Sequence, residues 1–436
     1  MKTVAFYTLG CKVNQYETQA ITNIFENAGY NIVDFNKKAD VYLINTCTVT
    51  NLSDRKSRQM IRRAKKLNGD SIVVVVGCYA QTAPEEVSKI EGVNLIVGTK
   101  ERSKIIDYIN EIETKKKKIN VVEDIMNERS FEEFGSGIYK ERTRAFIKIQ
   151  EGCNQFCSYC IIPYARGPIR SRSEKNVVEE VKKLLNFGYR EIVLTGIHIG
   201  SYGKDKKTTS LIELIKKVHE IDGIERIRLG SIEPNLISED FVNTIKNLKK
   251  MCPHYHVSLQ SGCDSTLERM NRKYTTLEYK KSISTLRREI EDVAISTDVM
   301  VGFPGETTEE FEKTYKFLDE ISFSGMHVFK YSPRKGTPAA SFESQVSPSK
   351  KEERSNRLFQ LSKEKTVEFN KRFIGDVMPV LFEQKVNYKH GYIEGFTPNY
   401  IKVLCKGDEN LKGQIVNVSL KETVDDFIIG KILDKD

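Results

Sequence analysis

The sequence predicts an α/β protein with a parallel-sheet amino-terminal domain over residues 1–113, a partial barrel of six strand and helix units over 139–369, and a small antiparallel β-barrel over 372–436. Three observations support this prediction. Apolar runs alternate with helical stretches through most of the chain, which is typical of parallel sheets. The periodicity fades over residues 114–142, which we expect to be a linker. From about residue 373 the segments become short and are separated by glycines, as in small antiparallel barrels.

The first part of the chain shows a repeated strand and helix pattern. A strand is expected over residues 3–9 and a helix from there to about Ala28, where Gly29 takes the place of a C′ glycine. Residues 14–17 fit a capping box at the start of this helix. Two further strands, each followed by a helical stretch, are expected over residues 41–44 and 72–76.

The middle part continues the alternation with six expected strands, at residues 146–150, 191–195, 226–229, 256–260, 296–301 and 326–331. Six units indicate an open or partial barrel, because a full eight-unit barrel needs more chain than this segment offers. A final helical stretch is expected over residues 350–369. The prediction for this part is therefore a partial (β/α)6 barrel.

The composition points to a globular protein without a membrane segment. Hydrophobic residues make up 39% of the chain, and no apolar run approaches the roughly 20 residues that a membrane span needs. The first residues lack the long apolar core of a secretory signal, so we expect a cytoplasmic protein with no membrane partner. Lys and Arg exceed Asp and Glu by 69 to 60, which favours an anionic partner.

Three of the nine cysteines each follow an expected strand directly: Cys11, Cys47 and Cys78. Without an export signal, cysteines point to metal binding or catalysis more than to disulfides. The carboxyl ends of parallel strands share one rim, so these thiols are expected to converge there. A rim of three thiolates predicts an iron–sulfur cluster with one iron open to another ligand. An ordinary buried cysteine is the alternative for any one of them.

A second triplet has the spacing C-x3-C-x2-C, formed by Cys153, Cys157 and Cys160. One loop of this length can hold three corners of an iron–sulfur cube. Zinc is the weaker alternative, because it normally takes four ligands and no fourth Cys or His lies at a fitting spacing. The remaining three cysteines have no partners at ligand spacing, and we expect no role in metal binding for them: Cys252, Cys263 and Cys405.

The second triplet resembles that of the radical S-adenosylmethionine superfamily. The resemblance extends to the methylthiotransferases of that superfamily over nearly the whole chain. LGCKVNQYET at residues 9–18, NTCTVT at 45–50 and GCYAQ at 77–81 resemble their amino-terminal domain. Their radical domain is matched by IQEGC, IIPYARG, LTG, SLQSGC and VGFPGE, which begin at residues 149, 161, 194, 258 and 301. The last segment resembles the small RNA-binding barrel called TRAM. The KVNQYE motif and Cys263 resemble the branch that acts on N6-threonylcarbamoyladenosine.

The resemblance implies two [4Fe-4S] clusters and S-adenosylmethionine as cofactors. Cys153, Cys157 and Cys160 would hold the radical cluster and act as the catalytic cysteines, and the first triplet would hold the other cluster. Tyr159 would pack on the adenine of the cofactor, with an ordinary core tyrosine as the alternative, and Gly196 and Gln260 would also contact the cofactor. By the same resemblance, one cofactor molecule methylates sulfur at the first cluster, and another gives the radical that abstracts hydrogen from adenine C2.

The implied substrate is tRNA, at the modified adenosine beside the anticodon, with an electron donor and a sulfur donor that the sequence does not identify. A basic helical stretch over residues 55–66 and the loop containing Arg166, Arg170 and Arg172 are candidates for phosphate contacts. Arg166 and Arg170 are also the first candidates for a cation that faces the threonyl carboxylate. Alternative substrates are isopentenyladenosine in tRNA and a ribosomal protein. An alternative of another class is a non-catalytic iron–sulfur RNA-binding protein.

Overall fold

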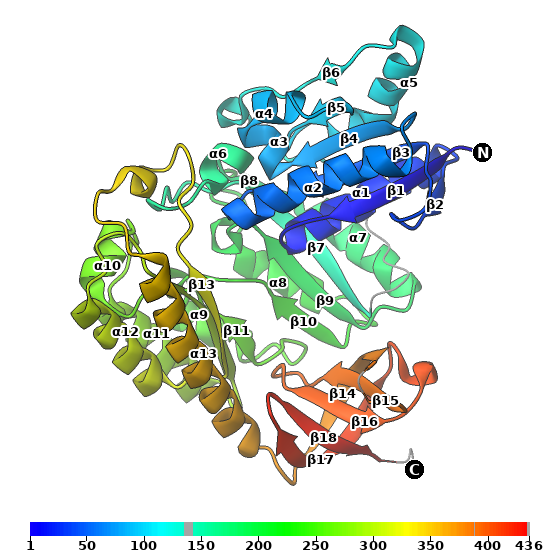
Figure 1. Ribbon diagram of the computed structural model, residues 1–436. Coiled ribbons are helices and arrows are strands. Elements are labelled where there is room, and N and C mark those ends of the chain that lie inside the picture. Colours follow the sequence, from blue (N-terminus) through cyan, green and yellow to red (C-terminus); the bar gives the residue numbers. More distant parts are fainter. Residues whose placement is uncertain (135–142, 388, 434–436) are drawn as a thin grey trace.

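The computed structural model describes residues 1–134, 143–387 and 389–433. The amino-terminal domain contains a six-stranded parallel sheet with strand order β2-β1-β3-β4-β5-β6 (Figure 1). Its strands are β1 (Thr3–Thr8), β2 (Asn31–Val33), β3 (Val41–Thr46), β4 (Ile72–Gly77), β5 (Val93–Val97) and β6 (Ile119–Asn120). The inner strands β3 and β4 are almost wholly buried, and separate apolar clusters cover the two faces of the sheet. Burial on both faces explains why these strands read as continuous apolar runs.

Helices connect these strands and carry the polar residues that follow them. They are α1 (Lys12–Asn27), α2 (Asn51–Leu67), α3 (Cys78–Thr82), α4 (Pro84–Ser88), the 3-10 turn η1 (Arg102–Lys104) and α5 (Ile105–Lys115). Gly29 follows the C-cap of α1 with φ of +81°, as the sequence predicts for a C′ glycine. The predicted capping box is wrong. The helix already begins at Lys12 with Cys11 at the N-cap and no side-chain cap, so Asn14 and Glu17 lie inside α1, where both are buried.

The expected linker is also partly wrong, because much of it is built into the amino-terminal domain. Strand β6 pairs in parallel with β5, and a 3-10 turn, η2, follows at Ile125–Asn127. Phe134 is buried in the apolar cluster on one face of the sheet. These contacts join residues that are far apart in sequence, and local periodicity does not report them. Residues 135–142 lie outside the described part, and the expected domain boundaries stay predictions.

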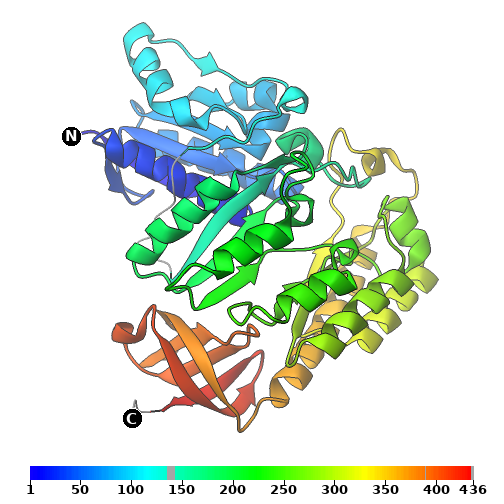
Figure 2. The ribbon, with the colours of Figure 1, turned by 180° about the vertical axis from the view of Figure 1, so that it is seen from behind.

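The second domain has two sheets that together form an open barrel (Figure 2). The first sheet has the order β10-β9-β7-β8 and contains β7 (Arg144–Glu151), β8 (Arg170–Ser171), β9 (Glu191–Gly196) and β10 (Arg226–Leu229). The second contains β11 (His254–His256), β12 (Ala294–Val301) and β13 (Gly325–Lys330) in that order. Single parallel bridges, Ile227 to Met251 and Ile232 to Val257, join the two sheets. Each of the six strands predicted for the partial barrel overlaps a strand of the structure, although β11 ends at His256, where the fourth strand was predicted to begin. Only the short β8 is antiparallel.

Helices cover the outside of this barrel, and one apolar core lies between them and the strands. On α7, for example, Val177, Val181 and Leu184 recur at helical spacing and are fully buried. The helices are α6 (Ile162–Arg166), α7 (Glu174–Asn186), α8 (Leu211–His219), α9 (Glu239–Ile245), α10 (Asp264–Arg269), α11 (Thr276–Glu289), α12 (Thr308–Ile321) and α13 (Pro348–Lys371), with 3-10 turns η3 (Ile199–Ser201), η4 (Pro234–Leu236) and η5 (Pro338–Ser341).

The carboxy-terminal domain is a closed five-stranded barrel with the order β14-β15-β16-β18-β17. Its elements are β14 (Val377–Lys385), β15 (Tyr392–Phe396), β16 (Lys402–Lys406), η6 (Glu409–Leu411), β17 (Ile415–Val424) and β18 (Phe427–Ile432). The pairings are antiparallel except that of β16 with β18. Arg226 of β10 donates to the Pro379 carbonyl at 2.7 Å, and Arg144 Nε lies 2.6 Å from Glu383 Oε1. These contacts hold the barrel against the second domain. No helix among the described residues is long and apolar enough to cross a membrane.

Candidate active site

The first cysteine triplet converges at the carboxyl edge of the amino-terminal sheet, as predicted. Cys11 follows β1, Cys47 follows β3, and Cys78 is the first residue of α3 after β4. Cys11 and Cys47 are electrostatic neighbours of the Cys78 thiol. Gly10, with φ of +106°, makes the turn, and a Cβ there would lie 2.9 Å from Cys47 Cβ. This close approach requires glycine.

The second triplet lies on the loop after β7. Gly152 has φ of +75°, and a Cβ at this position would lie 1.8 Å from the Pro168 carbonyl oxygen. The loop is thereby pressed against residues 167–168, and the Cys153 amide donates to the Gly167 carbonyl at 3.0 Å. Burial raises the pKa of the Cys153 thiol to about 11 and that of Cys160 to about 12.

Each triplet receives one guanidinium hydrogen bond on a sulfur atom. Arg166 Nε donates to Cys78 Sγ at 3.2 Å, and Arg272 Nη1 donates to Cys157 Sγ at 3.2 Å. Burial raises the pKa of the Cys78 thiol to about 12 in spite of Arg166. Three cysteine sulfurs with a guanidinium beside one of them fit the ligand set of an iron–sulfur cluster, because the guanidinium stabilises the negative charge of a ligating thiolate. Among the described residues, no group of three or more His, Cys, Asp or Glu side chains, the two triplets included, is arranged to hold a single metal ion.

A buried ion network joins the two domains beneath the first triplet. Glu17 of α1 contacts Lys148 of β7 at 2.9 Å and Arg102 at 2.5 Å. Arg166 pairs with Glu17 and with Glu151, the latter at 2.5 Å. Burial by itself would raise the pKa of Glu17, but Arg102, Arg166 and Lys148 outweigh it and lower that pKa to about 2. The KVNQYE motif thus supplies a carboxylate that connects the amino-terminal domain to the second domain.

This network overturns one interpretation of the sequence. Arg166 is fully buried, Arg170 and Arg172 are at most 5% exposed, and none of them is available to a phosphate or to a threonyl carboxylate. Arg172 pairs with Glu133 at 2.9 Å and also with Glu180. Arg170 donates to the Arg166 and Pro168 carbonyls, both at 3.0 Å. Two of the carboxylates, Glu17 beside Arg166 and Glu133 beside Arg172, lie 149 and 39 positions away along the chain, and a local motif does not reveal them.

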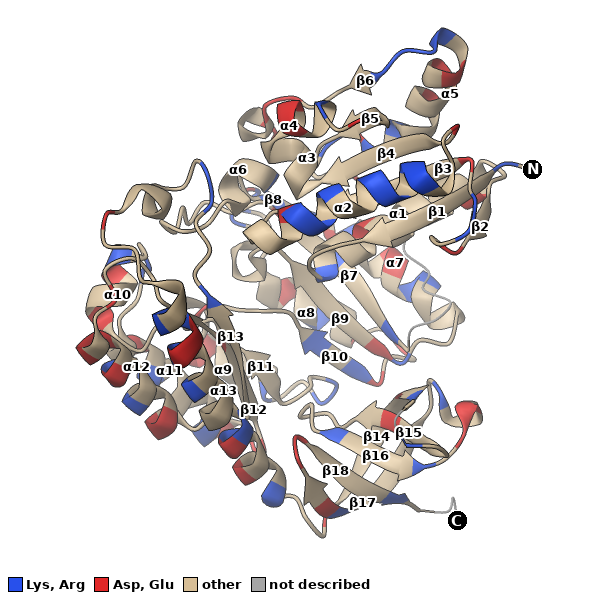
Figure 3. Ribbon diagram, viewed as in Figure 1, with Lys and Arg blue, Asp and Glu red and all other residues tan. Residues whose placement is uncertain are grey.

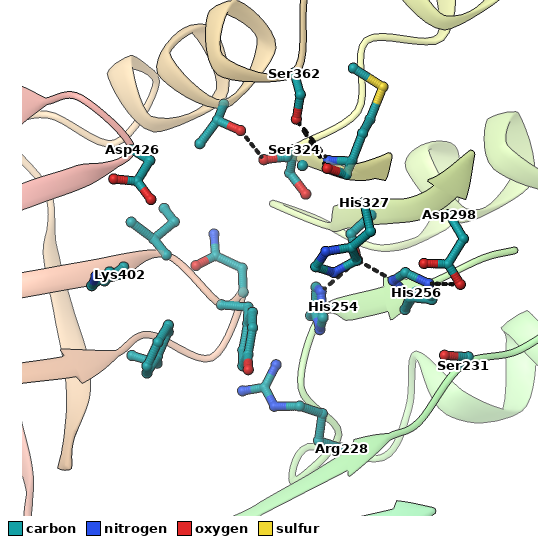
Figure 4. Close-up of a pocket in the computed structure, with 18 of the residues that line it drawn as sticks. Arg228, Ser231, His254, His256, Asp298, Ser324, His327, Ser362, Lys402 and Asp426 are labelled. Atoms are coloured by element: carbon teal, nitrogen blue, oxygen red, sulfur yellow. Dashed lines mark hydrogen bonds and ion pairs between the residues drawn. The ribbon is translucent and has the colours of Figure 1, made fainter. Parts of the chain in front are cut away.

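A large cavity of about 1230 Å³ opens between the three domains. Its wall includes Cys11 of the first triplet, Gly196 at the end of β9, and residues 228–231 at the end of β10. Residues of β11 to β13, of helix α13 and of the barrel loop around Tyr400 complete it. Figure 4 shows Arg228, His254, His256 and His327 on the side of the second domain, and Lys402 and Asp426 on the side of the carboxy-terminal barrel. The cavity therefore extends from a cysteine of the first triplet to the carboxy-terminal barrel.

Aromatic rings and histidines form part of the cavity wall. Tyr400 stacks on His254 at a centroid distance of 4.6 Å and on Phe396 at 4.8 Å. Ser296 Oγ lies 3.1 Å from His254 Nε2 and 3.0 Å from His256 Nδ1, and His256 Nε2 lies 3.1 Å from Asp298 Oδ2. Burial lowers the pKa of His254 well below its usual value, and Arg228 adds to this effect. A neutral histidine in a ring stack suits contact with a planar base.

The three expected cofactor contacts lie at different places. Gly196 ends β9 and lines the cavity. Gln260, with φ of +72°, joins the segment after β11 to β12 by accepting from the Met300 amide at 2.8 Å. Tyr159 packs edge-on against Phe303 at 6.5 Å. Their contacts with the cofactor stay predictions.

Sequence reasoning missed a polar cluster beside the second triplet. Glu233 accepts from Gln155 at 3.1 Å, lies 3.1 Å from His198 Nε2, and pairs with Arg272 at 2.8 Å. His198 and Glu233 follow β9 and β10, so their position just after the strand ends was a usable signal. Arg272 lies after α10, and no local pattern marks it. Through Glu233 and His198, the loop of the second triplet is linked to strand ends that line the cavity.

Two family models match the chain. The uncharacterised protein family UPF0004 matches residues 3–98, and the radical SAM superfamily matches residues 147–318. The chain is 46% identical to the threonylcarbamoyladenosine tRNA methylthiotransferase MtaB of Bacillus subtilis, over 96% of this chain and 94% of that protein. It is 40% identical to the MtaB of Aquifex aeolicus, over 95% and 99%. The chain belongs to the MtaB-type methylthiotransferase family. This methylthiotransferase is also 36% identical to a tRNA-2-methylthio-N(6)-dimethylallyladenosine synthase of Clostridium botulinum, over 95% and 93%.

Solved structures share the fold of the methylthiotransferase at low identity. The radical S-adenosylmethionine methyltransferase TsrM from Kitasatospora setae matches with a TM-score of 0.56 at 15% identity, over 78% of this chain and 75% of TsrM. The cobalamin-dependent radical enzyme OxsB matches with a TM-score of 0.54 at 12% identity, over 84% of this chain and 56% of OxsB. Family membership makes the chain a transferase that uses S-adenosylmethionine and [4Fe-4S] clusters.

Proposed function

We propose that this methylthiotransferase converts N6-threonylcarbamoyladenosine beside the tRNA anticodon into its 2-methylthio derivative, in the cytoplasm. The observation that carries the proposal is the 46% identity, over 96% of the chain, to a protein named for this substrate. Its identity to the dimethylallyladenosine synthase is lower, at 36%. The isopentenyladenosine alternative is therefore not favoured.

In this proposal each cysteine triplet holds one [4Fe-4S] cluster. Cys153, Cys157 and Cys160 hold the cluster that binds S-adenosylmethionine, which when bound supplies the radical chemistry that activates adenine C2. Cys11, Cys47 and Cys78 hold the cluster that presents sulfur. The role of the protein residues is to position these groups, and Arg166 and Arg272 each donate a hydrogen bond to one ligating sulfur.

The cavity between the domains is the proposed site of the modified adenosine. Its volume of about 1230 Å³ lies above the roughly 300 to 1,000 Å³ typical of ligand pockets, so a nucleoside with a large substituent can enter. Because Cys11 is on its wall, a cluster held by the first triplet would lie beside a base bound in this cavity. Extrusion of a base near the anticodon costs a few kcal/mol at most, because such bases are already partly unstacked.

The rest of the anticodon stem-loop is proposed to lie along helix α2. Helix α2 carries many Lys and Arg residues (Figure 3). Five of them are exposed and form no ion pair within the described residues: Arg55, Lys56, Arg62, Arg63 and Lys66. Unpaired cations on one helix are suited to phosphate contacts. The salt dependence of RNA binding follows from the number of such contacts.

The test compares three substrates with the purified, anaerobically reconstituted enzyme. They are tRNA that carries N6-threonylcarbamoyladenosine, tRNA that carries isopentenyladenosine, and the ribosomal protein. Nucleoside and peptide mass spectrometry should show methylthio transfer to the first substrate with at least tenfold preference in kcat/KM. Preference for either of the other two would overturn the proposed substrate. Absence of 5′-deoxyadenosine formation would favour the non-catalytic RNA-binding alternative.

A further inference from the structure

We infer that Lys12 is the residue that selects the threonyl carboxylate of the substrate. This inference rests on the proposed function and deepens it by naming the group that reads the N6 substituent. Lys12 is the first residue of α1, follows Cys11 directly, and is exposed into the cavity. Its position is therefore next to a proposed ligand of the cluster that presents sulfur.

Counter-ions distinguish Lys12 from every other cation on the described cavity wall. Arg228 Nε donates to Glu191 Oε1 at 2.7 Å. Lys363 pairs with Asp425 at 2.7 Å, and Lys402 pairs with Glu394 at 3.3 Å. Lys12 forms no ion pair within the described part of the chain; its ammonium lies 5.8 Å from the centroid of the Phe146 ring. A cation held in a protein cavity without a carboxylate partner is suited to an anionic ligand.

The surroundings of Lys12 favour an anion over a cation. Arg144, Arg228, Tyr400 and Glu191 lie within its electrostatic range, and Glu191 is already engaged by Arg228 and by Arg226. The acidic residues on the cavity wall are Asp298, which faces His256, and Asp425 and Asp426 on the turn between β17 and β18. Figure 4 shows Asp426 on the barrel side, away from Arg228. The Lys12 end of the cavity therefore has excess positive charge.

The chemistry of the substrate places its carboxylate near this end. Adenine C2, which receives the methylthio group, and N6, which carries the threonylcarbamoyl substituent, lie on either side of N1 on one edge of the base. When C2 faces the sulfur that a cluster held by Cys11, Cys47 and Cys78 would present, the N6 substituent is on the neighbouring part of the same edge of the base and would extend beside these residues. Lys12 is the unpaired cation there. An isopentenyl group carries no anion. With isopentenyladenosine bound in the cavity, the Lys12 ammonium would have no partner, and this disfavours that substrate.

The test pairs Lys12→Met with a change in the substrate. An anticodon stem-loop RNA carries either N6-threonylcarbamoyladenosine or the analogue in which the threonyl carboxylate is a neutral carboxamide. Wild-type holoenzyme should prefer the carboxylate in kcat/KM and in equilibrium binding by about 10- to 100-fold, the range of one charge-assisted hydrogen bond. Lys12→Met should lose this preference and should act on the carboxamide within about threefold of wild type. Lys12→Arg should keep most of the preference, because it keeps the charge.

Lys363→Met is the matched control, since Lys363 lines the same cavity and already has Asp425 as a partner. It should keep the wild-type preference. Iron content shows whether the cluster next to Lys12 is intact in each variant, and cofactor cleavage without RNA shows whether the radical cluster is intact. Equal wild-type activity on carboxylate and carboxamide would overturn the role of Lys12 without any variant, as would an unchanged preference in Lys12→Met. Failure of wild-type enzyme to modify the threonylcarbamoyl RNA at all would instead overturn the proposed function.

Discussion

Arg166 donates from Nε to the sulfur of Cys78 at 3.2 Å while its Nη1 pairs with Glu151 at 2.5 Å. One guanidinium from the end of α6, the helix after the cysteines of the second triplet, thus contacts a ligand of the other proposed cluster. Arg166 also pairs with Glu17 of α1, so the same side chain connects both domains. The position of the first triplet relative to the radical domain depends on this buried contact.

Arg166→Met should destabilise the protein strongly. The substitution leaves Glu17 and Glu151 buried with one cation fewer, and such losses cost about 3 to 5 kcal/mol. Urea denaturation of the purified chain measures the effect. Arg190→Met is the control, because Arg190 pairs with Glu225 on the surface at 3.1 Å and should cost less than about 1 kcal/mol. Equal midpoints for the two variants would contradict the structural role of the network.

Loss of the two cysteine triplets should have separable effects. Cys157→Ala should abolish formation of 5′-deoxyadenosine, whereas Cys47→Ala should leave it measurable and stop methylthio transfer. Wild-type protein should contain about eight irons per chain, and removal of Cys11, Cys47 and Cys78 together should leave about four. Iron and sulfide analysis with an assay of 5′-deoxyadenosine checks both results. If Cys47→Ala abolishes cleavage in protein that still contains about four irons, the roles are not separate.

Gly152→Ala should disrupt the loop of the second triplet. Its φ is +75°, and the added methyl group would lie 1.8 Å from the Pro168 carbonyl oxygen. Gly29→Ala is a matched control, because Gly29 also has positive φ, at +81°, but a methyl group there would have no atom within 4 Å. The control should cost about 1 kcal/mol for backbone strain alone. Gly152→Ala should cost clearly more and reduce iron at the second triplet, as read by denaturation and iron analysis.

Charge reversal on α2 should weaken tRNA binding. The double variant Arg62→Glu with Lys66→Glu should raise the Kd for tRNA and reduce the slope of log K against log salt by about 1 to 2. Lys182→Glu with Lys183→Glu makes the same charge change on exposed residues of α7. Filter binding at several salt concentrations compares the two. If the α7 variant loses as much affinity as the α2 variant, net charge and not the α2 surface controls binding.

The stabilising effect of Glu17 should disappear in acid. Its pKa in the folded protein is about 2, below the ordinary value of 4.5, because Arg102, Arg166 and Lys148 outweigh the effect of burial. The ionised form is thus favoured by folding, and its contribution is complete above about pH 4.5 and declines as the pH falls toward about 2. The difference in unfolding free energy between wild type and Glu17→Gln should narrow over this range. A difference that stays constant from about pH 6 to about pH 2 would contradict the assignment.

The order of residues along the chain is enough to predict the long buried strands and the cysteines that follow them. Apolar runs such as 72–76 mark strands because both faces of β4 are buried, and Cys11, Cys47 and Cys78 come next in the chain. Parallel strands then bring these residues to one edge whatever the rest of the fold. The small carboxy-terminal barrel could be predicted for a similar reason, since its short strands and the glycines between them are local features of the sequence.

Which cations are free depends on the tertiary structure. Arg166 and Lys12 each lie near a cysteine motif, and the sequence favoured Arg166 as the residue for the substrate carboxylate. The fold brings Glu17 and Glu151 onto Arg166 and buries it, whereas Lys12 faces the cavity without a carboxylate partner among the described residues. A charged side chain is neutralised by whichever counter-ion packing places beside it, and Glu17 lies 149 positions from Arg166. Burial and pairing are long-range properties, so residue type and spacing do not specify them.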